Sequence, residues 1–438
     1  MPDLDAATFL NNLKQYKAGA HVALAVSGGA DSMGLLALAA EARHVPDAPR
    51  FSVLSVNHGL RAAAADEIAA VAQACAAVGL PHVALAADGP LADSNLQEQA
   101  RRLRYRLMAA WCAANGATSV VTAHHRQDQA ETVLMRLARG AGVNGLSGMA
   151  AAQNLRTAAG PLRLVRPLLA NAPEQLRDCA EQAGFPMAED ASNHDRKFER
   201  VRWRQALPHL AEVGLTVDAL AGLADEMRHI RGQENRALLD WMKGAAHWHG
   251  YGVLCLDGAA YRDLHAAMRQ RLVTAVVSYF GQLPYPPKTA ALQSFAAAPQ
   301  ADHYGGATLG GTQMRWRRDK VLFGRETAAA PKTAMVTGAV VWDGRVALQA
   351  KPGVKNVDGL NVAALGRRGV QQMRDAGAIF DETVPACYHT ALAGIFAADR
   401  LLGCPQLVST DGPMTDFTVA PVQQGELFRD ILGGGQDW

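Results

Sequence analysis

The sequence predicts an α/β fold, with an N-terminal domain built on a parallel β-sheet, a mostly helical central domain and a small mixed α/β C-terminal domain. In the N-terminal half, short apolar runs alternate with helical patterns, and repeated strand–helix units form parallel sheets covered by helices on both faces. After Leu210 a largely helical stretch begins, and short strands of alternating polarity follow over 308–325. The length of 438 residues also exceeds what one hydrophobic core usually supports, which indicates several domains.

The apolar runs define the elements of the N-terminal domain. A first strand is expected over 21–26, and a glycine-containing turn and a helix over 31–40 follow it. The later elements, in chain order, are a strand at 51–56, a helix at 62–78, a strand at 83–85, a helix at 95–115 and a strand at 119–122. Ligands bind beyond the carboxyl ends of parallel strands, so the residues that follow the strands should line one crevice. These residues are Ser27, Asn57, His58 and His124.

Changes of composition mark the expected domain boundaries. The helical stretch at 217–280 places the end of the first domain near residue 212, and prolines within 284–287 interrupt that stretch. The segment 328–332 is typical of a linker, and a strand over 340–348 follows it. We therefore expect domains at 1–212, 213–327 and 333–438.

Charge and cysteine content argue against some classes of function. The net charge is only +2, so a nucleic-acid partner would be bound by local basic patches and not by a basic body. The six cysteines stand at long spacings without a Cys-x-x-Cys pair, which argues against a zinc site, an iron–sulfur cluster or a redox couple. The first residues lack the pattern of a signal peptide, and no apolar run is long enough to span a membrane. A cytoplasmic protein without a membrane partner is expected.

The segment Ser27-Gly28-Gly29-Ala30-Asp31-Ser32 has the features of a phosphate-binding loop. Glycines let the backbone approach a ligand, and serine hydroxyls and the first N–H groups of the next helix can donate to phosphate oxygens. The segment lacks the lysine of a Walker loop and the spacing of a dinucleotide fingerprint. Its aspartate offers a carboxylate that can hold Mg²⁺ against phosphates. The alternative is a plain turn that caps the following helix.

This loop resembles the PP-loop of N-type ATP pyrophosphatases. The resemblance implies a Rossmann-like domain of the adenine nucleotide alpha hydrolase-like type, which cleaves ATP to AMP and pyrophosphate through an adenylated intermediate. It also implies ATP and Mg²⁺ as cofactors, with Asp31 as the metal ligand. The expected ATP-binding residues are Ser27, Gly28, Gly29, Ala30, Asp31, Ser32, Asn57, His58, Arg101 and Arg104.

A second motif occupies residues 122–132. It resembles the His-His-x-Asp-Asp-Gln-x-Glu-Thr signature of the tRNA(Ile)-lysidine synthetase family, with Gln127 in place of the first Asp. The resemblance implies that Asp128 and Glu131 bind lysine and act in catalysis together with Asp31. Residues three apart share one helix face, so the two carboxylates can converge on a cationic amine. The alternative is a capping box, in which Asp128 caps the helix and Glu131 reaches back to its start.

Further matches to this family involve arginines. In the Glu-x-x-Ala-Arg-x-x-Arg-Tyr pattern at 97–105, Gln97 replaces the glutamate, and the two arginines are Arg101 and Arg104. These two arginines are expected to contact ATP phosphates, and an exposed charged helix face is the alternative.

The segment 190–208 carries the next match, in which Val201 replaces a usual asparagine. Arg200 and Arg204 remain, and we expect them to meet tRNA phosphates. A helix stabilised by salt bridges is the alternative.

Together, the resemblance implies ATP-dependent ligation of L-lysine to C2 of the wobble cytidine in the isoleucine tRNA with a CAU anticodon. An adenylated tRNA would be the intermediate, and AMP and pyrophosphate would be released. The two later domains would bind the tRNA, and the oligomeric state stays open, with a dimer as one option. The alternatives are another PP-loop enzyme that thiolates tRNA, or a catalytically weakened, nucleotide-dependent RNA-binding protein.

Overall fold

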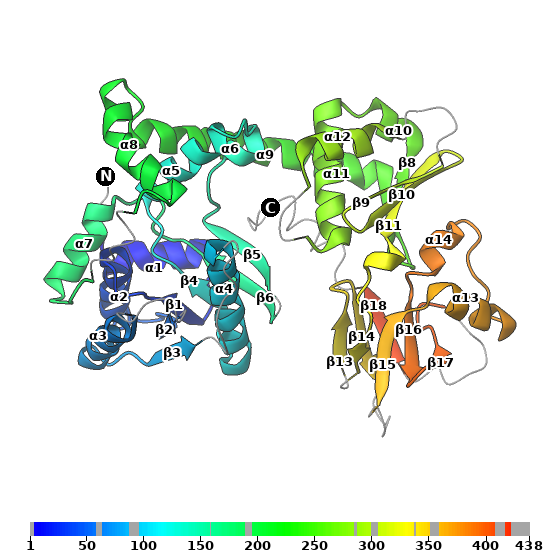
Figure 1. Cartoon of the computed structure of the whole chain (residues 1–438), viewed down its shortest axis with the longest axis horizontal. Coiled ribbons are helices and arrows are strands. Elements are labelled where there is room, and N and C mark those ends of the chain that lie inside the picture. The colour runs from blue at the N-terminus through cyan, green and yellow to red at the C-terminus, as the bar shows by residue number, and fades with distance from the viewer. Residues whose placement is uncertain are drawn as a thin grey trace. The chain divides into compact units, whose positions relative to one another are not determined.

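The computed structural model describes residues 4–57, 64–86, 96–157, 159–188, 195–283, 287–298, 305–336, 339–350, 359–407 and 417–421. The chain forms two compact units. The first contains the described residues up to Gln233, and the second begins at Glu234, inside the long helix α9 (Val217–Ala245) (Figure 1). The expected site residue His58 and the segment 190–193 lie outside the described residues. The expected division at residue 212 precedes α9, and it stays a prediction.

A six-stranded sheet organises the first unit, with the strand order β3-β2-β1-β4-β6-β5. Its strands are β1 (His21–Ala25), β2 (Arg50–Asn57), β3 (His82–Ala86), β4 (Ser119–Val121), β5 (Ala152–Thr157) and β6 (Gly160–Val165). The pairs β1–β2, β1–β4, β2–β3 and β4–β6 are parallel. Among the described strands of this sheet, only the edge strand β5 runs antiparallel to its neighbour. The predicted parallel sheet is confirmed, whereas the β5–β6 hairpin was not predicted.

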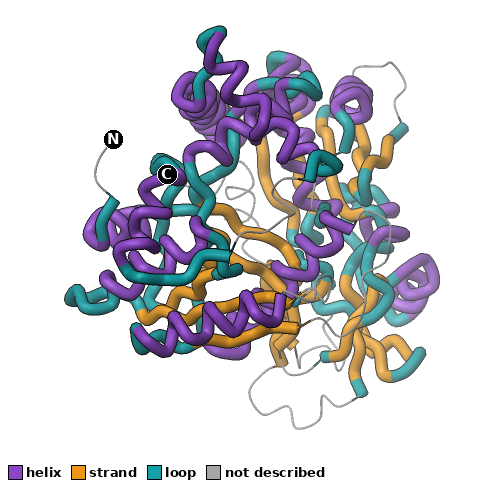
Figure 2. The backbone as a smooth tube through the Cα atoms, turned by 60° about the vertical axis from the view of Figure 1, so that its left-hand side comes forward, coloured by secondary structure: helices purple, strands orange, loops and turns teal. Residues whose placement is uncertain are grey.

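Helices cover both faces of this sheet, as the alternating pattern predicts (Figures 1 and 2). The described helices that precede α9 are α1 (Ala6–Gln15), α2 (Ala30–Ala42), α3 (Ala64–Ala77), α4 (Leu96–Asn115), α5 (Arg126–Leu137), α6 (Val143–Leu146), α7 (Pro173–Gln182) and α8 (Glu199–Glu212). Val22 and Leu24 pack into a core shared with α1, α2, α3 and α7, whereas Ala23 and Leu54 pack with α4 on the other face. The alternation of side chains along a strand accounts for this division.

Helices α2 and α7 approach each other unusually closely. Gly34 of α2 lies against the backbone of α7, and a Cβ atom placed on it would be 2.1 Å from the carbonyl oxygen of Leu176. The close packing therefore depends on the missing side chain at this position. Because the first residues of α2 belong to the predicted phosphate loop, the contact with α7 also helps to position that loop.

The central part of the chain contains more strand than its sequence predicted. The predicted helical stretch 217–280 is interrupted by β7 (Ala246–His249) and β8 (Val253–Asp257), which pair across a turn that contains Gly252 at φ 73°. They join a five-stranded sheet of order β7-β8-β11-β10-β9. Its other elements are α10 (Gly258–Asp263), α11 (Ala266–Gly281), α12 (Thr289–Ala297), β9 (Ala307–Leu309), β10 (Thr312–Arg317) and β11 (Lys320–Arg325). The strands predicted within 308–325 are confirmed.

The C-terminal part is a mixed α/β region, as predicted. It contains a four-stranded sheet of order β12-β15-β16-β17 and a three-stranded sheet of order β13-β14-β18. Its elements are β12 (Ala334–Met335), β13 (Ala339–Trp342), β14 (Val346–Ala350), β15 (Leu360–Ala364), α13 (Gly366–Asp375), α14 (Ala386–His389), β16 (Ala393–Ala397), β17 (Arg400–Gly403) and β18 (Phe417–Pro421). Among the described helices, none is both long and apolar enough to cross a membrane.

A buried ion group joins this region to the central sheet. Asp343 lies in the turn between β13 and β14 and accepts hydrogen bonds from Arg325 Nε at 3.0 Å and from Arg345 Nε at 2.9 Å. All three side chains are at most 5% exposed. Arg325 ends β11 and also donates to the carbonyl of Phe280 at 2.6 Å. The group therefore ties β11, α11 and the β13–β14 turn together.

Candidate active site

The predicted phosphate loop lies between the end of β1 and the start of α2. The hydroxyl of Ser32 accepts from the backbone N–H of Ser27 at 3.1 Å and donates to the carbonyl of Gly29 at 2.9 Å, which closes the loop on itself. Gly28 has φ 93°, a conformation that favours glycine. A Cβ on Gly29 would meet no atom within 4 Å, so open space lies in front of the helix start. This arrangement suits an anion held by backbone N–H groups.

His125 connects this loop to α5. Its Nε2 lies 3.5 Å from Asp31 Oδ2 and 3.5 Å from Asp128 Oδ2, and its side chain is 4% exposed. Burial opposes the protonation of His125, but the carboxylates of Asp31, Asp128 and Glu131 outweigh burial and raise its pKa. A cationic imidazole between the two acidic groups would hold the loop and α5 together. His125 is a site residue that the sequence motif did not predict, although it lies between His124 and Asp128 in that motif.

The start of α5 shows which part of the capping interpretation holds. Asp128 is the third residue of the helix, and its Oδ2 accepts from the backbone N–H of His125 at 3.0 Å. His125 is therefore the N-cap residue, and Asp128 reaches back to it. The alternative that Asp128 is the cap and Glu131 reaches back is wrong, because the described contacts of Glu131 are with Gln127, Arg200 and Arg204.

Asp128 and Glu131 form an ion cluster with two arginines of α8. Glu131 has no exposed side-chain surface, and its Oε2 accepts from Arg200 Nε at 2.5 Å while its Oε1 accepts from Arg204 Nε at 2.7 Å. Arg200 Nη2 also donates to Asp128 Oδ1 at 2.5 Å. Burial would raise the pKa of Asp128, but Arg200 and then His125 hold it below its usual value. The four predicted residues therefore converge, with carboxylates and guanidinium groups neutralising each other.

The sequence predicts that Arg200 and Arg204 contact tRNA phosphates. Their side chains are each 38% exposed, and the described hydrogen bonds run inward to the carboxylates. Without tRNA, the two arginines of α8 form salt bridges with Asp128 and Glu131, as the alternative of a salt-bridged helix expects. Their contact with tRNA stays a prediction.

His124 and Arg101 lie at the edge of this cluster. His124 shares a 2.7 Å hydrogen bond with Thr122, and burial lowers its pKa to about 3. The Asp128 carboxylate opposes this shift in the pKa, and the positive charges of Arg166, Arg200 and Arg101 add to it. The guanidinium of Arg101 lies over the ring of Tyr105 at 5.0 Å, and Arg104 is exposed on the same helix. Asn57 ends β2 at the same sheet edge as the loop.

The donors around Asp31 fit the Mg²⁺ that the sequence implies. The described residues include no group of three or more His, Cys, Asp or Glu side chains arranged to hold a metal ion. Mg²⁺ commonly binds one or two carboxylates and completes its shell with phosphate oxygens and water. Asp31 has a side chain that is 46% exposed, and it begins the helix behind the phosphate loop. A metal shared with a bound nucleotide suits this donor set better than a metal held by protein alone.

The fold and this loop define a PP-loop ATP-binding domain, and a family model described as "PP-loop domain" matches residues 3–210. The relatives narrow the class further. A tRNA(Ile)-lysidine synthase of Ruegeria pomeroyi is 37% identical over 358 residues, which cover 80% of this chain and 81% of that protein. The chain belongs to the tRNA(Ile)-lysidine synthase family.

Two more relatives with this name match shorter stretches of the chain. The enzyme of Methylobacterium nodulans is 42% identical over 228 residues, covering 51% of this chain and 65% of the relative. That of Novosphingobium aromaticivorans is 40% identical over 266 residues, covering 59% and 76%. The predicted family is thereby confirmed.

Proposed function

We propose that this protein ligates L-lysine to C2 of the wobble cytidine in the isoleucine tRNA with a CAU anticodon. ATP first adenylates the tRNA with release of pyrophosphate, and the lysine amine then displaces AMP. The observation that carries this proposal is a phosphate loop and a buried carboxylate pair joined by His125, within a chain of this family. A phosphate site next to a site for a cationic amine is what the two steps require.

The nucleotide half of the reaction is assigned to the loop 27–32. Its N–H groups and the start of α2 would hold the phosphates, and Mg²⁺ on Asp31 would neutralise the departing pyrophosphate. Arg101 and Arg104, and Asn57 with His58, would complete the ATP site. The closed loop geometry and the exposed carboxylate of Asp31 support this assignment.

The amine half is assigned to Asp128 and Glu131. Their carboxylates would bind the side-chain ammonium of lysine and orient it toward the activated carbon. The lowered pKa of Asp128 favours a charged, binding role for this residue over proton abstraction. Arg200 and Arg204 occupy the same oxygens in the free chain, so one of them must yield to the substrate. A tRNA phosphate would be a suitable new partner for the released guanidinium.

The second unit is assigned to tRNA binding, divided into the central and C-terminal domains expected from the sequence. The hairpin of β10 and β11 supports this assignment because it carries Arg315, Arg317, Arg318 and Lys320 on a short segment. We also propose that the protein acts in the cytoplasm, where it would meet its tRNA substrate.

The decisive experiment supplies the purified protein with ATP, Mg²⁺, labelled L-lysine and unmodified isoleucine tRNA with a CAU anticodon. We expect label in the tRNA together with one AMP per lysine. A matched tRNA with a changed wobble base serves as the control and should take up no label. AMP formation without label transfer would contradict the ligase assignment and favour another PP-loop activity. Absence of both would favour a weakened, RNA-binding protein.

A further inference from the structure

A cavity of about 280 Å³ opens in the first unit. It lies where three helices begin, because Arg126 and Gln127 start α5, Glu174 lies in the first turn of α7, and Asp218 in that of α9. The backbone N–H of Arg126 donates to the carbonyl of Asn171 at 2.8 Å, which fixes the starts of α5 and α7 side by side. The volume is below that of most drug-sized sites and suits a small ligand.

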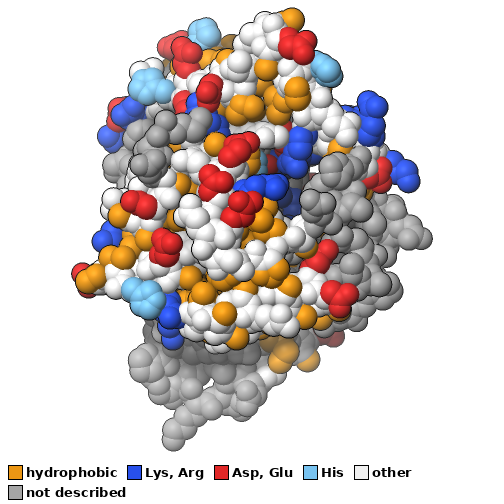
Figure 3. Space-filling view, turned by 90° about the vertical axis from the view of Figure 1, so that its left-hand side faces the viewer, with side chains coloured by type: hydrophobic (Ala, Val, Ile, Leu, Met, Phe, Trp, Pro, Cys, Tyr) orange, Lys and Arg blue, Asp and Glu red, His pale blue; other side chains and the backbone are white. Residues whose placement is uncertain are grey.

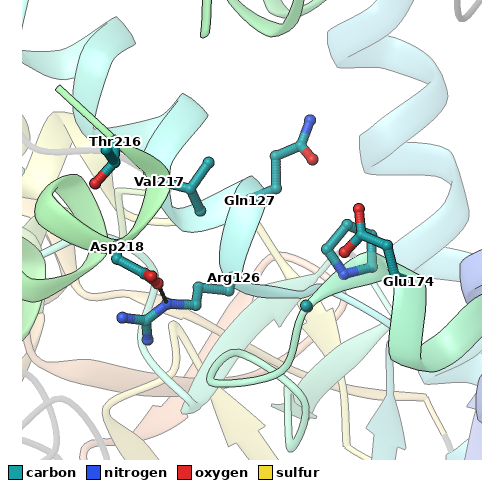
Figure 4. A pocket seen from close by; sticks show the side chains of 8 residues that line it. Arg126, Gln127, Glu174, Thr216, Val217 and Asp218 are labelled. Carbon is teal, nitrogen blue, oxygen red and sulfur yellow. Dashed lines mark hydrogen bonds and ion pairs between the residues drawn. The ribbon is translucent and has the colours of Figure 1, made fainter. Parts of the chain in front are cut away.

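The cavity presents both signs of charge. Arg126 Nε and Asp218 Oδ1 pair at 2.5 Å on one side, and the carboxylate of Glu174 lies on the other side, as Figure 4 shows. The pair uses Nε of Arg126, and a guanidinium has five N–H donors in all. On the surface of this unit, acidic and basic side chains also gather side by side (Figure 3). A ligand that carries one carboxylate and one ammonium matches this distribution.

Gln127 connects the cavity to the carboxylate pair. Its side chain lines the cavity, and its Nε2 donates to Glu131 Oε1 at 3.5 Å. The four residues from Gln127 to Glu131 advance about 6 Å along the helix axis. The five bonds between the α-carbon and the ε-nitrogen of lysine also span roughly 6 Å when extended. The length of a lysine side chain therefore matches the helical rise between Gln127, which lines the cavity, and Glu131.

We propose that this cavity binds the α-amino acid end of the lysine substrate, an inference that rests on the proposed function. Arg126, held by Asp218, pairs with the α-carboxylate, and Glu174 pairs with the α-ammonium. The starts of the three helices favour the carboxylate through their partial positive charge. The cavity then selects a complete amino acid over a simple amine of the same length.

The test compares L-lysine with cadaverine, which lacks the α-carboxylate, in the tRNA assay. The parent protein should prefer lysine in kcat/KM by about 100-fold or more, because cadaverine leaves the cavity's polar groups unpaired. Arg126→Gln should raise KM for lysine about 10-fold or more and leave cadaverine unchanged, so the preference shrinks. Glu174→Gln should instead reduce the discrimination against Nα-acetyl-L-lysine, which lacks the α-ammonium.

The matched control is Arg228→Gln. Arg228 pairs with Asp225 at 2.5 Å, and the side-chain exposures of 24% and 62% are close to the 21% and 64% of Arg126 and Asp218. This variant should keep the parent's preference. Equal use of cadaverine by the parent, or an unchanged preference in both cavity variants, would overturn the inference alone. A parent that transfers no lysine would overturn the proposed function as well. If Arg126→Gln does not fold, Glu174→Gln, at an exposed position, decides the question.

Discussion

Single residues separate the two halves of the proposed reaction. Asp31 lies at the phosphate loop with an exposed carboxylate, whereas Glu131 is fully buried against two guanidinium groups. His125 connects the two regions, because its Nε2 lies 3.5 Å from both Asp31 Oδ2 and Asp128 Oδ2. On the proposed roles, the two acidic residues bind different ligands, so their substitutions should impair different steps.

Asp31→Ala should lower AMP formation by about 100-fold or more, because it removes the carboxylate that we propose would hold Mg²⁺ against the leaving pyrophosphate. Glu131→Ala should raise the lysine concentration needed for half-maximal rate by about 10-fold and leave nucleotide binding largely intact. Nucleotide binding by calorimetry and lysine-dependent rates measure the two effects. Equal loss of nucleotide binding in both variants would refute this division of roles.

His124 should make the first unit sensitive to mild acid. Its pKa is about 3 in the folded chain against 6.5 ordinarily, so the unfolded chain binds a proton first as the pH falls. The stabilisation is complete above pH 6.5 and is lost between there and about pH 3, by at most about 1.4 kcal/mol per pH unit. Urea unfolding of the parent and of His124→Asn at several pH values should show a constant difference above pH 7. Below pH 6 the difference should move in favour of the variant, and a difference independent of pH would contradict the assignment.

Among the secondary-structure elements, features encoded by neighbouring residues could be predicted from the sequence, whereas contacts between distant residues could not. The phosphate loop and the helix face shared by Asp128 and Glu131 were predicted because their residues are close together in the chain. The β7–β8 pair was missed because a short apolar run at Val253 looks like buried helix, and only two glycines, Gly250 and Gly252, signal the turn. The pairing of Arg200 with Glu131 joins residues 69 positions apart, and no local pattern encodes such a contact.

The contact between α2 and α7 can be tested by adding a methyl group. Gly34→Ala should destabilise the first unit by about 1–3 kcal/mol, because the new Cβ meets the rigid backbone of Leu176. Gly222→Ala in α9 is the matched control, since a Cβ there meets nothing within 4 Å. The control should gain about 0.5–1 kcal/mol from helix propensity. Similar stabilities of the two variants in urea would contradict the close packing.

The ion group around Asp343 should hold the central and C-terminal elements of the second unit together. Asp343→Asn keeps the shape and tolerates the positive φ of 51°, but it leaves two buried guanidinium groups without an anion. A loss of roughly 3 kcal/mol in the free energy of unfolding is expected. Asp240→Asn, whose pair with Lys243 is 69% and 77% exposed, should cost less than about 1 kcal/mol. Equal costs would show that the group contributes little.

At the scale of the whole molecule, a net charge of +2 means that tRNA must be met by local groups of basic residues. The β10–β11 hairpin offers such a group, with Arg317 opposite Lys320 in its register. Changing both to Gln should reduce the slope of log affinity for tRNA against log salt concentration by about 1–2. Arg177→Gln on the exposed side of α7 is the control and should leave the slope unchanged. Equal slopes in the parent, the hairpin variant and the control would show that the hairpin does not bind tRNA.

The arginines on Asp128 and Glu131 also bear on how arginine is told apart from lysine. On the proposed role of these carboxylates, the free chain already fills its amine site with guanidinium groups of its own. Because they are tethered, their effective concentration far exceeds that of any free amino acid. Free arginine carries the same head group and must displace Arg200 or Arg204 to bind the carboxylates. An ammonium, compact and with three donors, makes contacts that the tethered groups do not. The tethered arginines therefore oppose the binding of lysine and of arginine alike, and the contacts that only an ammonium makes distinguish the two.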